Sequence, residues 1–437
     1  MLKQKLRDGY KQARLIPRYL LLEIPNDWNL ISIRKLTIKH NSGIFKNRDS
    51  YGSGSNIVGV SDLYDNYYVD GQTFNLVNLS DKEKVNHILQ EGDLIYAESS
   101  LVRDGIAKTL YVTKKGADTL FEWHTRRISL SDHVVPAYAY YCINLPKIRA
   151  SLISRSTTTV LTGITTKEYF DTLIPFPPTK SEQQKISSIL SNIDSLIQQT
   201  QKEIEQTQRL KKGLMQRLST RGIGHTKFKT VIFGTRWMET EIPINWEFQK
   251  LKKIAQFRQG LQIAKVERFS EPAKDRLKLI KVDDFLSERQ KPEYITIPSD
   301  SRKSVVCTKD DIIVARTGTI GLVLTDVEGV FHNNTFVIDY NKTLFHKMYF
   351  YYYLTSEPVQ LFIKIISTRT SQGDLTHREF GELGVPIPPL PEQRKIASVI
   401  SDIESKIQKN QESKFKLETL KKGLMQKLLT GQMRVKI

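Results

Sequence analysis

The chain of 437 residues contains little cysteine and no long hydrophobic run. Its two cysteines, Cys142 and Cys307, lie far apart in apolar surroundings, which excludes a disulfide framework and a cysteine-based metal site. No stretch approaches the roughly 18 apolar residues needed to span a bilayer. The N-terminal segment MLKQKLRDGYKQAR also lacks the apolar core of a signal peptide. These absences predict a soluble cytoplasmic protein with no membrane partner.

Motifs of catalysis are missing as well. The sequence has no Gly-Lys dipeptide for a Walker A loop, no GxSxG, no HExxH, and no Asn/Asp-Pro-Pro-aromatic motif of an adenine methyltransferase. The eight histidines show no metal-ligand spacing. A nuclease-like run, Asp402 followed by Glu404-Ser405-Lys406, falls in a predicted helix, where we interpret it as a solvated face. We therefore expect no catalytic residues, no bound metal and no cofactor on this chain.

One long segment occurs twice. The first copy begins at Ile174 with IPFPPTKSEQQKISSIL, and the second begins at Val385 with VPIPPLPEQRKIASVI. Glu182 and Glu392 are separated by 210 residues, and the same spacing relates the two KKGLMQ sequences that start at Lys211 and Lys421. A constant spacing over a whole segment indicates a duplicated structural unit.

Each copy predicts one long helix. A proline pair precedes it, and apolar residues then recur at steps of three and four within a polar remainder. This narrow apolar stripe favours a coiled-coil seam, and about 38 residues correspond to a rod of roughly 57 Å. The other copy is the obvious partner, which predicts an antiparallel pair within one chain. The alternative is that each helix packs on its own domain or pairs two chains.

The globular parts are also repeated. Ile24-Pro25-Asn26-Asp27-Trp28 returns as Ile242-Pro243-Ile244-Asn245-Trp246, 218 residues later. We predict an α+β fold with a pseudo-two-fold internal repeat and two similar globular domains, with helices at 134–153 and 346–366. The predicted order is an N-terminal arm (1–23, basic and partly helical), a first domain (24–178), a central helix (179–221), a linker with the second domain (222–389), and a C-terminal helix with its tail (390–437). Because the arm resembles the segment after the first helix, we expect it to pack against the end of the C-terminal helix.

The charge balance points to a polyanionic partner. Lysine and arginine number 66 against 47 acidic residues, a formal net charge of +19. The basic residues are spread along the chain, which favours nucleic acid over a membrane surface. Arginine, glutamine, asparagine and hydroxyl side chains read base edges, although a charged loop is often only solvated. The candidate DNA-contacting residues in the loops are Lys46, Arg48, Tyr51, Arg155, Thr157, Arg258, Gln259, Gln262, Lys265, Arg316, Thr317, Arg369 and Gln372.

Three motifs together resemble a known family. They are IPxxW at the start of each domain, the sequence DDIIVARTGTIG at 310–321, and PIPPLPEQRKIA followed by LKKGLMQKLLTG at 386–431 with its earlier twin. This pattern resembles the specificity subunit of type I restriction–modification systems. One difference stands out, because AESSLVRDGIAK at 97–108 replaces ARTGTIGLV of 315–323, so the Arg316 loop has no direct counterpart in the first domain.

The resemblance implies a defined role. Two target-recognition domains would each read one half of a split double-stranded DNA sequence, and the antiparallel helices would set the spacer between the halves. Two methyltransferase subunits would dock on the chain and restriction subunits could join, with S-adenosylmethionine, ATP and Mg²⁺ bound by these partners. A coiled-coil adaptor that binds only protein, and a stand-alone DNA-modifying enzyme, are the alternatives.

Overall fold

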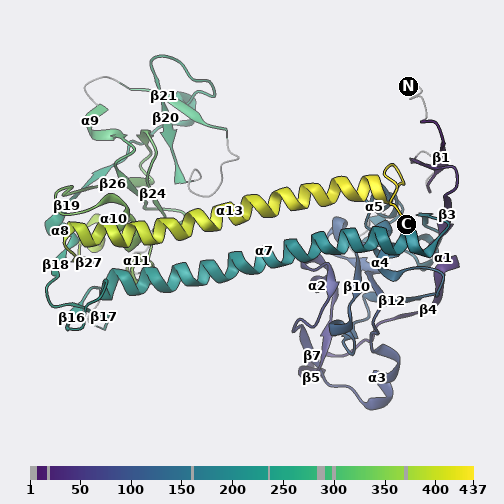
Figure 1. Cartoon of the computed structure of the whole chain (residues 1–437). Coiled ribbons are helices and arrows are strands. Elements are labelled where there is room, and N and C mark those ends of the chain that lie inside the picture. The colour runs from purple at the N-terminus through teal and green to yellow at the C-terminus, as the bar shows by residue number, and fades with distance from the viewer. Residues whose placement is uncertain are drawn as a thin grey trace. The chain divides into compact units, whose positions relative to one another are not determined.

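The computed structural model describes residues 7–16, 20–158, 162–234, 237–282, 291–297, 302–368 and 373–437. The chain forms two compact units, unit 1 with Met1–Thr200 and Ser413–Ile437, and unit 2 with Gln201–Glu412. Figure 1 labels the elements of both units. Within the described ranges, no helix combines the length and the apolar character needed to cross a bilayer.

Unit 1 is built on a five-stranded sheet of order β4-β12-β8-β10-β6. Its strands are Thr37–Ser42, Thr125–Leu130, Leu94–Ala97, Thr109–Val112 and Tyr68–Val69, in that order. Every residue of β8 is buried, as expected for a short apolar run that follows the Gly92-Asp93 turn. Smaller sheets pair β11 (Leu120–Phe121), β5 (Tyr51–Val58) and β7 (Asn75–Val77), and β13 (Thr157–Thr158), β14 (Thr162–Gly163) and β9 (Ser99–Ser100).

The remaining elements of unit 1 are short helices and edge strands. They are β1 (Tyr10–Arg14), β2 (Leu21–Pro25), β3 (Asn29–Ser32), α1 (Ile33–Leu36), η1 (Arg48–Ser50), α2 (Val60–Asp65), α3 (Asp81–His87), η2 (Arg103–Gly105), η3 (Lys114–Gly116), α4 (Pro136–Ile143), α5 (Pro146–Ser154), α6 (Thr166–Phe170) and β15 (Leu173–Phe176). Trp28 of the IPxxW motif is fully buried in this core, together with Tyr138 and Tyr169.

Unit 2 repeats the plan with two four-stranded sheets. One has the order β19-β26-β23-β24, with strands Ala255–Gln259, Thr335–Tyr340, Ile312–Ala315 and Val323–Leu324. The other has the order β21-β20-β25-β22, with strands Glu293–Thr296, Arg276–Ile280, Gly329–Phe331 and Val306–Cys307. Its other elements are β16 (Phe228–Ile232), β17 (Glu239–Pro243), β18 (Glu247–Lys250), α8 (Leu251–Ile254), η4 (Lys265–Glu267), α9 (Arg302–Val305), α10 (Lys347–Leu354), α11 (Glu357–Ser367), α12 (His377–Phe380) and β27 (Gly384–Ile387).

The prediction of a partly helical N-terminal arm is wrong for the described residues. β1 and β2 form an antiparallel hairpin in which Tyr10 pairs with Pro25 and Arg14 with Leu21. Ala13, Leu22 and Ile24 are buried at alternate positions, which is the period of a strand and not of a helix. The hairpin has its counterpart in unit 2, where β16 and β17 pair in the same way, from Phe228 with Pro243 to Ile232 with Glu239.

The two predicted helices at 134–153 and 346–366 are each split in two. α4 ends at Ile143 and α5 begins at Pro146, while α10 ends at Leu354 and Pro358 lies in the first turn of α11. Proline lacks an N–H for the preceding turn but is well suited to the first turn of a helix, so it ends one helix and starts the next.

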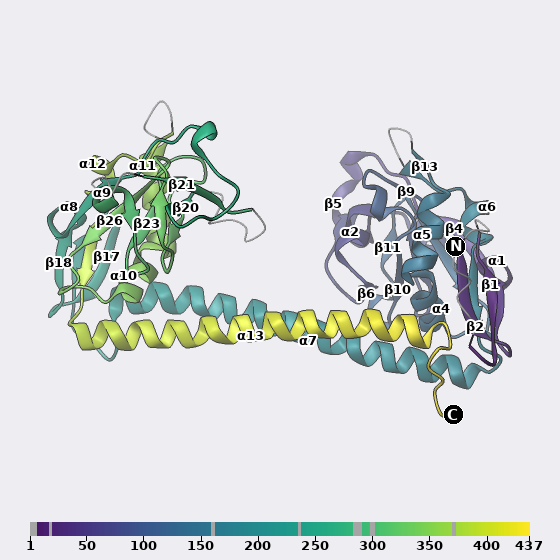
Figure 2. The ribbon, with the colours of Figure 1, turned by 90° about the horizontal axis from the view of Figure 1, so that it is seen from above.

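The two long helices are α7 (Lys180–Arg221) and α13 (Leu390–Leu428). They run antiparallel and side by side within each unit (Figures 1 and 2). In unit 1 the Lys421 ammonium lies 2.5 Å from the Asp194 carboxylate, and in unit 2 Lys211 lies 2.6 Å from Glu404. The lysines are equivalent in the repeat, and so are the acids, which confirms the predicted intramolecular antiparallel coiled coil and its pseudo-two-fold pattern.

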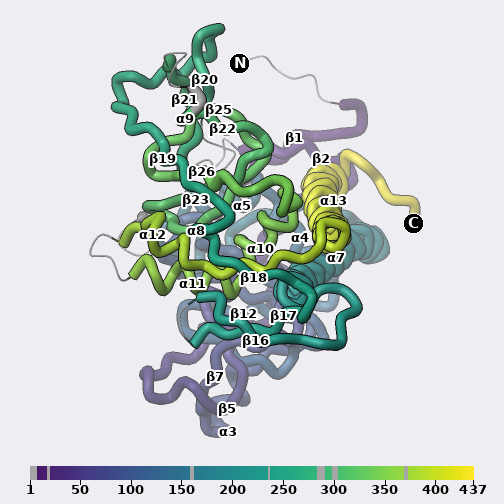
Figure 3. Tube along the Cα trace, turned by 90° about the vertical axis from the view of Figure 1, so that its left-hand side faces the viewer, coloured from purple at the N-terminus to yellow at the C-terminus, as the bar shows by residue number. Residues whose placement is uncertain are grey.

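The first turns of both helices bind the chain segment that follows the other helix. In unit 1, Arg434 of the C-terminal tail pairs with Glu182 at 2.8 Å, and the Tyr10 hydroxyl donates to the carbonyl of Gly431 at 2.8 Å. The predicted packing of the N-terminal arm against the end of the C-terminal helix is therefore confirmed (Figure 3). In unit 2, Glu392 accepts from the backbone N–H of Ile223, which follows α7, at 2.9 Å.

Candidate nucleic-acid interface

In unit 2, a tight backbone junction forms where the end of β19 meets the turn between β25 and β26. We define the second-domain junction as residues 260–262 and 331–335. The Leu261 N–H donates to Phe331 O at 3.0 Å, and the Asn333 N–H donates to Leu261 O at 2.9 Å. A Cβ on Gly260 would lie 2.1 Å from the carbonyl oxygen of His332, so only glycine permits this approach.

The junction gathers amide side chains at one surface. Gln259 Nε2 donates to Asn333 O at 2.7 Å, and Asn333 Nδ2 approaches Gln262 Oε1 at 3.4 Å. Gln259 and Gln262 are exposed, and so is Lys265 in η4. The structure therefore brings two predicted glutamines together around Asn333, a residue that the sequence reading missed. Its signal was available, since Asn333 and Asn334 form the only Asn-Asn pair of the sequence.

The Arg316 loop meets the same turn. The backbone N–H of Arg316 donates to Asn334 O at 2.7 Å, and that of Thr317 lies 3.4 Å from the same oxygen. The Arg316 guanidinium bonds to Asp374 at 3.2 Å and stays partly exposed. Arg316 and Thr317 thus lie beside the amide cluster. Arg369 and Gln372 lie outside the described residues.

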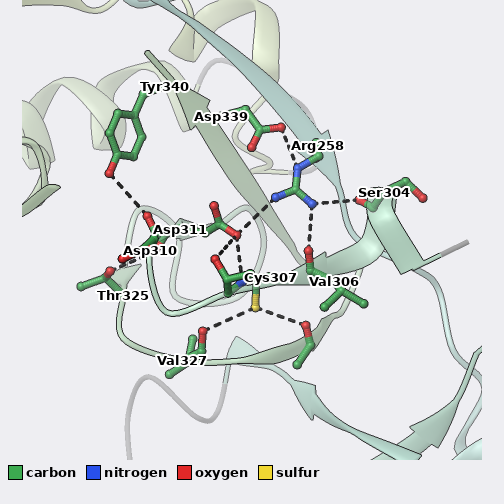
Figure 4. Close-up of polar contacts among 12 residues, drawn as sticks. Arg258, Ser304, Val306, Cys307, Asp310, Asp311, Thr325, Val327, Asp339 and Tyr340 are labelled. Carbon is green, nitrogen blue, oxygen red and sulfur yellow. Dashed lines mark hydrogen bonds and ion pairs between the residues drawn. The ribbon is translucent and has the colours of Figure 1, made fainter. Parts of the chain in front are cut away.

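Arg258 has a different place from the other candidates. Its guanidinium donates to Asp339 at 2.6 Å and to the carbonyl of Val306 at 2.9 Å, and it lies 3.4 Å from Asp311 (Figure 4). It also lies over the Phe331 ring, 5.6 Å from its centroid. These contacts tie β19 to β26 and β22, so this side chain stabilises the domain from within.

Arg155 of unit 1 is engaged in a similar way. Its guanidinium donates to Glu168 O at 2.6 Å, to Ser151 O at 3.2 Å and to the Thr172 hydroxyl. Burial lowers the pKa of Arg155, which is consistent with a group withdrawn from solvent. Thr157 is exposed on β13, where its hydroxyl donates to Gly163 O at 3.2 Å.

The loop between β4 and β5 carries the other candidates of unit 1. Lys46 pairs with Glu83 at 2.7 Å. Hydrogen bonds from Lys46 and Ser80 lower the pKa of Glu83 to about 2. Arg48 is exposed in η1, whereas Tyr51 at the start of β5 is half-buried against a small apolar cluster. Of these three side chains, Arg48 is the one most open to an external anion.

Unit 1 repeats the junction of unit 2. We define the first-domain junction as residues 43–45 and 121–125. The Ile44 N–H donates to Phe121 O at 2.9 Å, and the Trp123 N–H donates to Ile44 O at 3.0 Å. A Cβ on Gly43 would lie 2.0 Å from the carbonyl oxygen of Glu122, as at Gly260. The backbone is therefore shared, but Phe45 and Trp123 stand where unit 2 has Gln262 and Asn333.

The position of Arg316 also differs between the units. The residue after β8 is Glu98, and its carboxylate accepts from Arg126 Nε at 3.0 Å and from Ser42 Oγ at 3.4 Å. An acid bound within the domain thus replaces a partly exposed arginine. The structure therefore agrees with the sequence difference between residues 97–108 and 315–323, since the first domain has no arginine at the position of Arg316.

The described residues offer no metal site, since no group of three or more His, Cys, Asp or Glu side chains among them is arranged to hold an ion. Burial raises the pKa of the Cys142 thiol to about 12 and that of Cys307 to about 11, so both thiols are unreactive at neutral pH.

A cavity of about 420 Å³ in unit 1 is lined by Tyr64, Tyr141 and Lys108, and burial lowers the pKa of Lys108 to about 8.

Fold and surface together define a class of protein: a duplicated α+β chain with an antiparallel helix pair and one polar or aromatic loop surface in each repeat. The family described as type I restriction modification DNA specificity domain matches residues 25–206 and 243–419. This chain belongs to that family.

Similar proteins include two type I restriction enzyme specificity subunits of Methanocaldococcus jannaschii. The MjaVIII subunit is 26% identical over 434 residues and covers 95% of each chain, and the MjaIX subunit is 26% identical over 436 residues, covering 94% of this chain and 95% of its own. Among solved structures, the specificity subunit of a type I system from M. genitalium superposes with a TM-score of 0.57 at 15% identity over 98% of each chain. A chain solved in work on assembly and conformational transition of a type I system gives a TM-score of 0.53 at 13% identity, covering 94% of this chain and 99% of its own.

Proposed function

We propose that this chain is the DNA sequence-specificity subunit of a type I restriction–modification complex, in which each domain reads one half of a bipartite target. The observation that carries the proposal is the duplicated junction, where one backbone presents different side chains in the two units. Two copies of one scaffold with unlike surfaces suit the reading of two unlike half-sites.

The chemistry of the second-domain junction suits base recognition. Asparagine and glutamine amides bond to the N6 and N7 edge of adenine, and arginine bonds to the O6 and N7 edge of guanine. Gln262, Asn333 and Arg316 supply both kinds of group beside one turn. The net charge of +19 would hold the phosphates, which gives binding a steep dependence on salt.

The helix pair would serve as spacer and docking surface. Two methyltransferase subunits would bind to it, restriction subunits could join the assembly, and S-adenosylmethionine, ATP and Mg²⁺ would be bound by these partners. This chain would contribute no catalytic residue.

Deleting one heptad from each helix removes about 10 Å of rod, so we expect the unread spacer to shorten by about three base pairs. An unchanged spacer would contradict the role of the helices as a ruler.

The proposal is tested by co-expressing the chain with its methyltransferase subunit and mapping N6-methyladenine in the host DNA. We expect methylation at one bipartite sequence with a fixed gap. A contiguous target, or methylation without sequence preference, would contradict the proposal. Methylation by the purified chain alone would favour a stand-alone enzyme, and absence of specific DNA retention at moderate salt with partners present would favour a protein-binding adaptor.

A further inference from the structure

The first-domain junction presents two aromatic rings to solvent. Phe45 is 61% exposed and Trp123 is 46% exposed, although large aromatic side chains normally contribute to a core. Their ring centroids lie 5.1 Å apart at an interplanar angle of 82°, an edge-to-face contact. The two rings therefore form an ordered apolar surface that is exposed to solvent.

Backbone and side-chain contacts hold this pair in place. The hydrogen bonds of Ile44 to Phe121 and of Trp123 to Ile44 fix the two chain segments side by side. The centroids of the Trp123 and His124 rings lie 3.7 Å apart, and the Ser99 hydroxyl is hydrogen-bonded to His124 Nδ1. The rings are thus pre-organised, which lowers the entropy cost of any contact that they make.

The equivalent positions of unit 2 suggest what the pair would meet. Gln262 and Asn333 present amides there, and under the proposed function these face base edges. Phe45 offers no hydrogen-bonding group to a base edge. The one apolar group on a base edge in the major groove is the C5 methyl of thymine. An aromatic pair at this position therefore matches thymine, as the amide pair matches adenine.

We propose that Phe45 and Trp123 form a contact site for a thymine methyl group in the half-site read by the first domain. This inference rests on the proposed function and makes it specific. Exposed Arg48 follows Phe45 by three residues and is available to a neighbouring phosphate. Insertion of a ring between base pairs is disfavoured, because it would break the edge-to-face contact between the two rings.

The test uses the full-length chain, assembled with its methyltransferase subunits, and synthetic duplexes that carry its mapped target. Each thymine is replaced in turn by deoxyuridine, which removes only the C5 methyl, and affinity is measured by fluorescence anisotropy. At one thymine of one half-site we expect binding by the unchanged chain to weaken about fourfold, the effect of exposing one buried methyl group. The Phe45→Ala and Trp123→Ala variants should bind the thymine and deoxyuridine duplexes equally.

Matched variants separate this site from general effects. Trp237→Ala removes a tryptophan of unit 2 that is 64% exposed, and it should leave the deoxyuridine effect intact. Asn333→Ala should also leave it intact while relaxing the other half-site. Thermal unfolding checks that the Phe45→Ala and Trp123→Ala variants remain folded, and Phe45→Leu, which keeps an apolar side chain, should retain part of the effect.

The outcomes distinguish the two proposals. If the unchanged chain binds no DNA specifically with its partners present, the proposed function falls and this inference falls with it. If binding is specific but no thymine shows a methyl effect that depends on Phe45 or Trp123, only the inference is overturned. Equal losses on thymine and deoxyuridine duplexes in the Phe45→Ala variant would indicate a ring wedged between bases and would also overturn it.

Discussion

The two domains differ at their surfaces and agree in the backbone beneath. Gly43 and Gly260 allow the same close approach to a carbonyl oxygen, at 2.0 and 2.1 Å from an added Cβ. Above these glycines one domain carries two aromatic rings and the other two amides. Hydrogen bonds between main-chain groups hold each junction together, and these bonds do not depend on which side chains lie above them. The fold can therefore be kept while the exposed residues change.

The helix pair shows the same contrast in its ion pairs. In unit 1 the side chains of Lys421 and Asp194 are 13% and 7% exposed, whereas those of Lys211 and Glu404 in unit 2 are 28% and 35% exposed. A tyrosine hydroxyl donates to the acid in both units, Tyr141 to Asp194 at 2.7 Å and Tyr352 to Glu404 at 2.6 Å, so the two pairs differ in exposure. Equivalent positions thus carry one buried and one partly solvated pair, and the repeat is symmetric in geometry but not in expected energy.

Removing the acid of each pair should show the largest difference between the units. Asp194→Ala leaves a buried ammonium without its partner, and we expect a loss of about 3–5 kcal/mol in the free energy of unfolding. Glu404→Ala should cost less, about 1–2 kcal/mol, because Lys211 stays partly in water although the Tyr352 hydroxyl loses its acceptor. Urea unfolding followed by circular dichroism measures both. Asp194→Asn, which keeps one of the two acceptor oxygens, should fall between the two alanine variants. Equal losses for the two alanine variants would refute the comparison.

Two candidate arginines of unit 2, Arg258 and Arg316, should separate stability from recognition. Arg258→Ala removes the partner of Asp339 and Asp311, so we expect unfolding to become easier by about 2–3 kcal/mol. Arg316→Ala should leave stability nearly unchanged but reduce discrimination at one base pair by about 1–3 kcal/mol. Thermal unfolding and competition binding with single-base variants of the target measure these effects. A stability loss in both variants would place Arg316 in the structural framework as well.

Alanine at the two junction glycines should have similar effects in both domains. The added methyl group overlaps a carbonyl oxygen at Gly43 and at Gly260, so each variant should lose about 1–3 kcal/mol of stability. Gly213 in α7 has open space around its Cβ position, and Gly213→Ala should instead stabilise by about 0.5–1 kcal/mol through helix propensity. Chemical unfolding compares the three variants. A neutral Gly43→Ala change would show that the first-domain junction is looser than the structure indicates.

Acid should weaken unit 2 more than unit 1, which is the smallest expected effect. Among the described residues, burial first and neighbouring cations second lower the pKa of His332, His346 and His377 in unit 2, but only of His40 in unit 1. Each histidine then binds its proton more readily in the unfolded state, so stability falls as the pH drops below about 6.5. Calorimetry from about pH 7.5 to about pH 5.5 measures the loss. His377→Phe should reduce it, and an unchanged pH dependence would exclude His377 as a contributor.

Much of the fold was predictable because the sequence repeats itself. A 210-residue spacing and a stripe of apolar residues were enough to predict the antiparallel helices. Helix breaks at Pro146 and Pro358 were also readable, but the apolar clusters around them hid the boundaries. The N-terminal hairpin was missed because its lysines and arginines looked like a solvated helix, whereas pairing with β2 decides its structure.

The candidate site was only partly predictable. Composition alone cannot tell an arginine that contacts solvent from one that bonds within its own domain, as Arg155 and Arg258 do. Asn333 lies in a short turn, and the Asn-Asn pair at 333–334 was its one signal in the sequence. Asn333 and Trp123 occupy equivalent positions in the two halves. Trp123 follows Glu122, which forms a β-bridge with Ile44, and Asn333 follows His332, which forms a β-bridge with Leu261. The predicted DNA contacts themselves stay predictions.

Methylation mapping of a Gln262→Ala, Asn333→Ala double variant, co-expressed with the methyltransferase subunit, tests most directly that each domain reads its own half-site. We expect degenerate bases in one half-site, with the other half-site and the gap unchanged. Altered bases in both half-sites, or a changed gap, would contradict it.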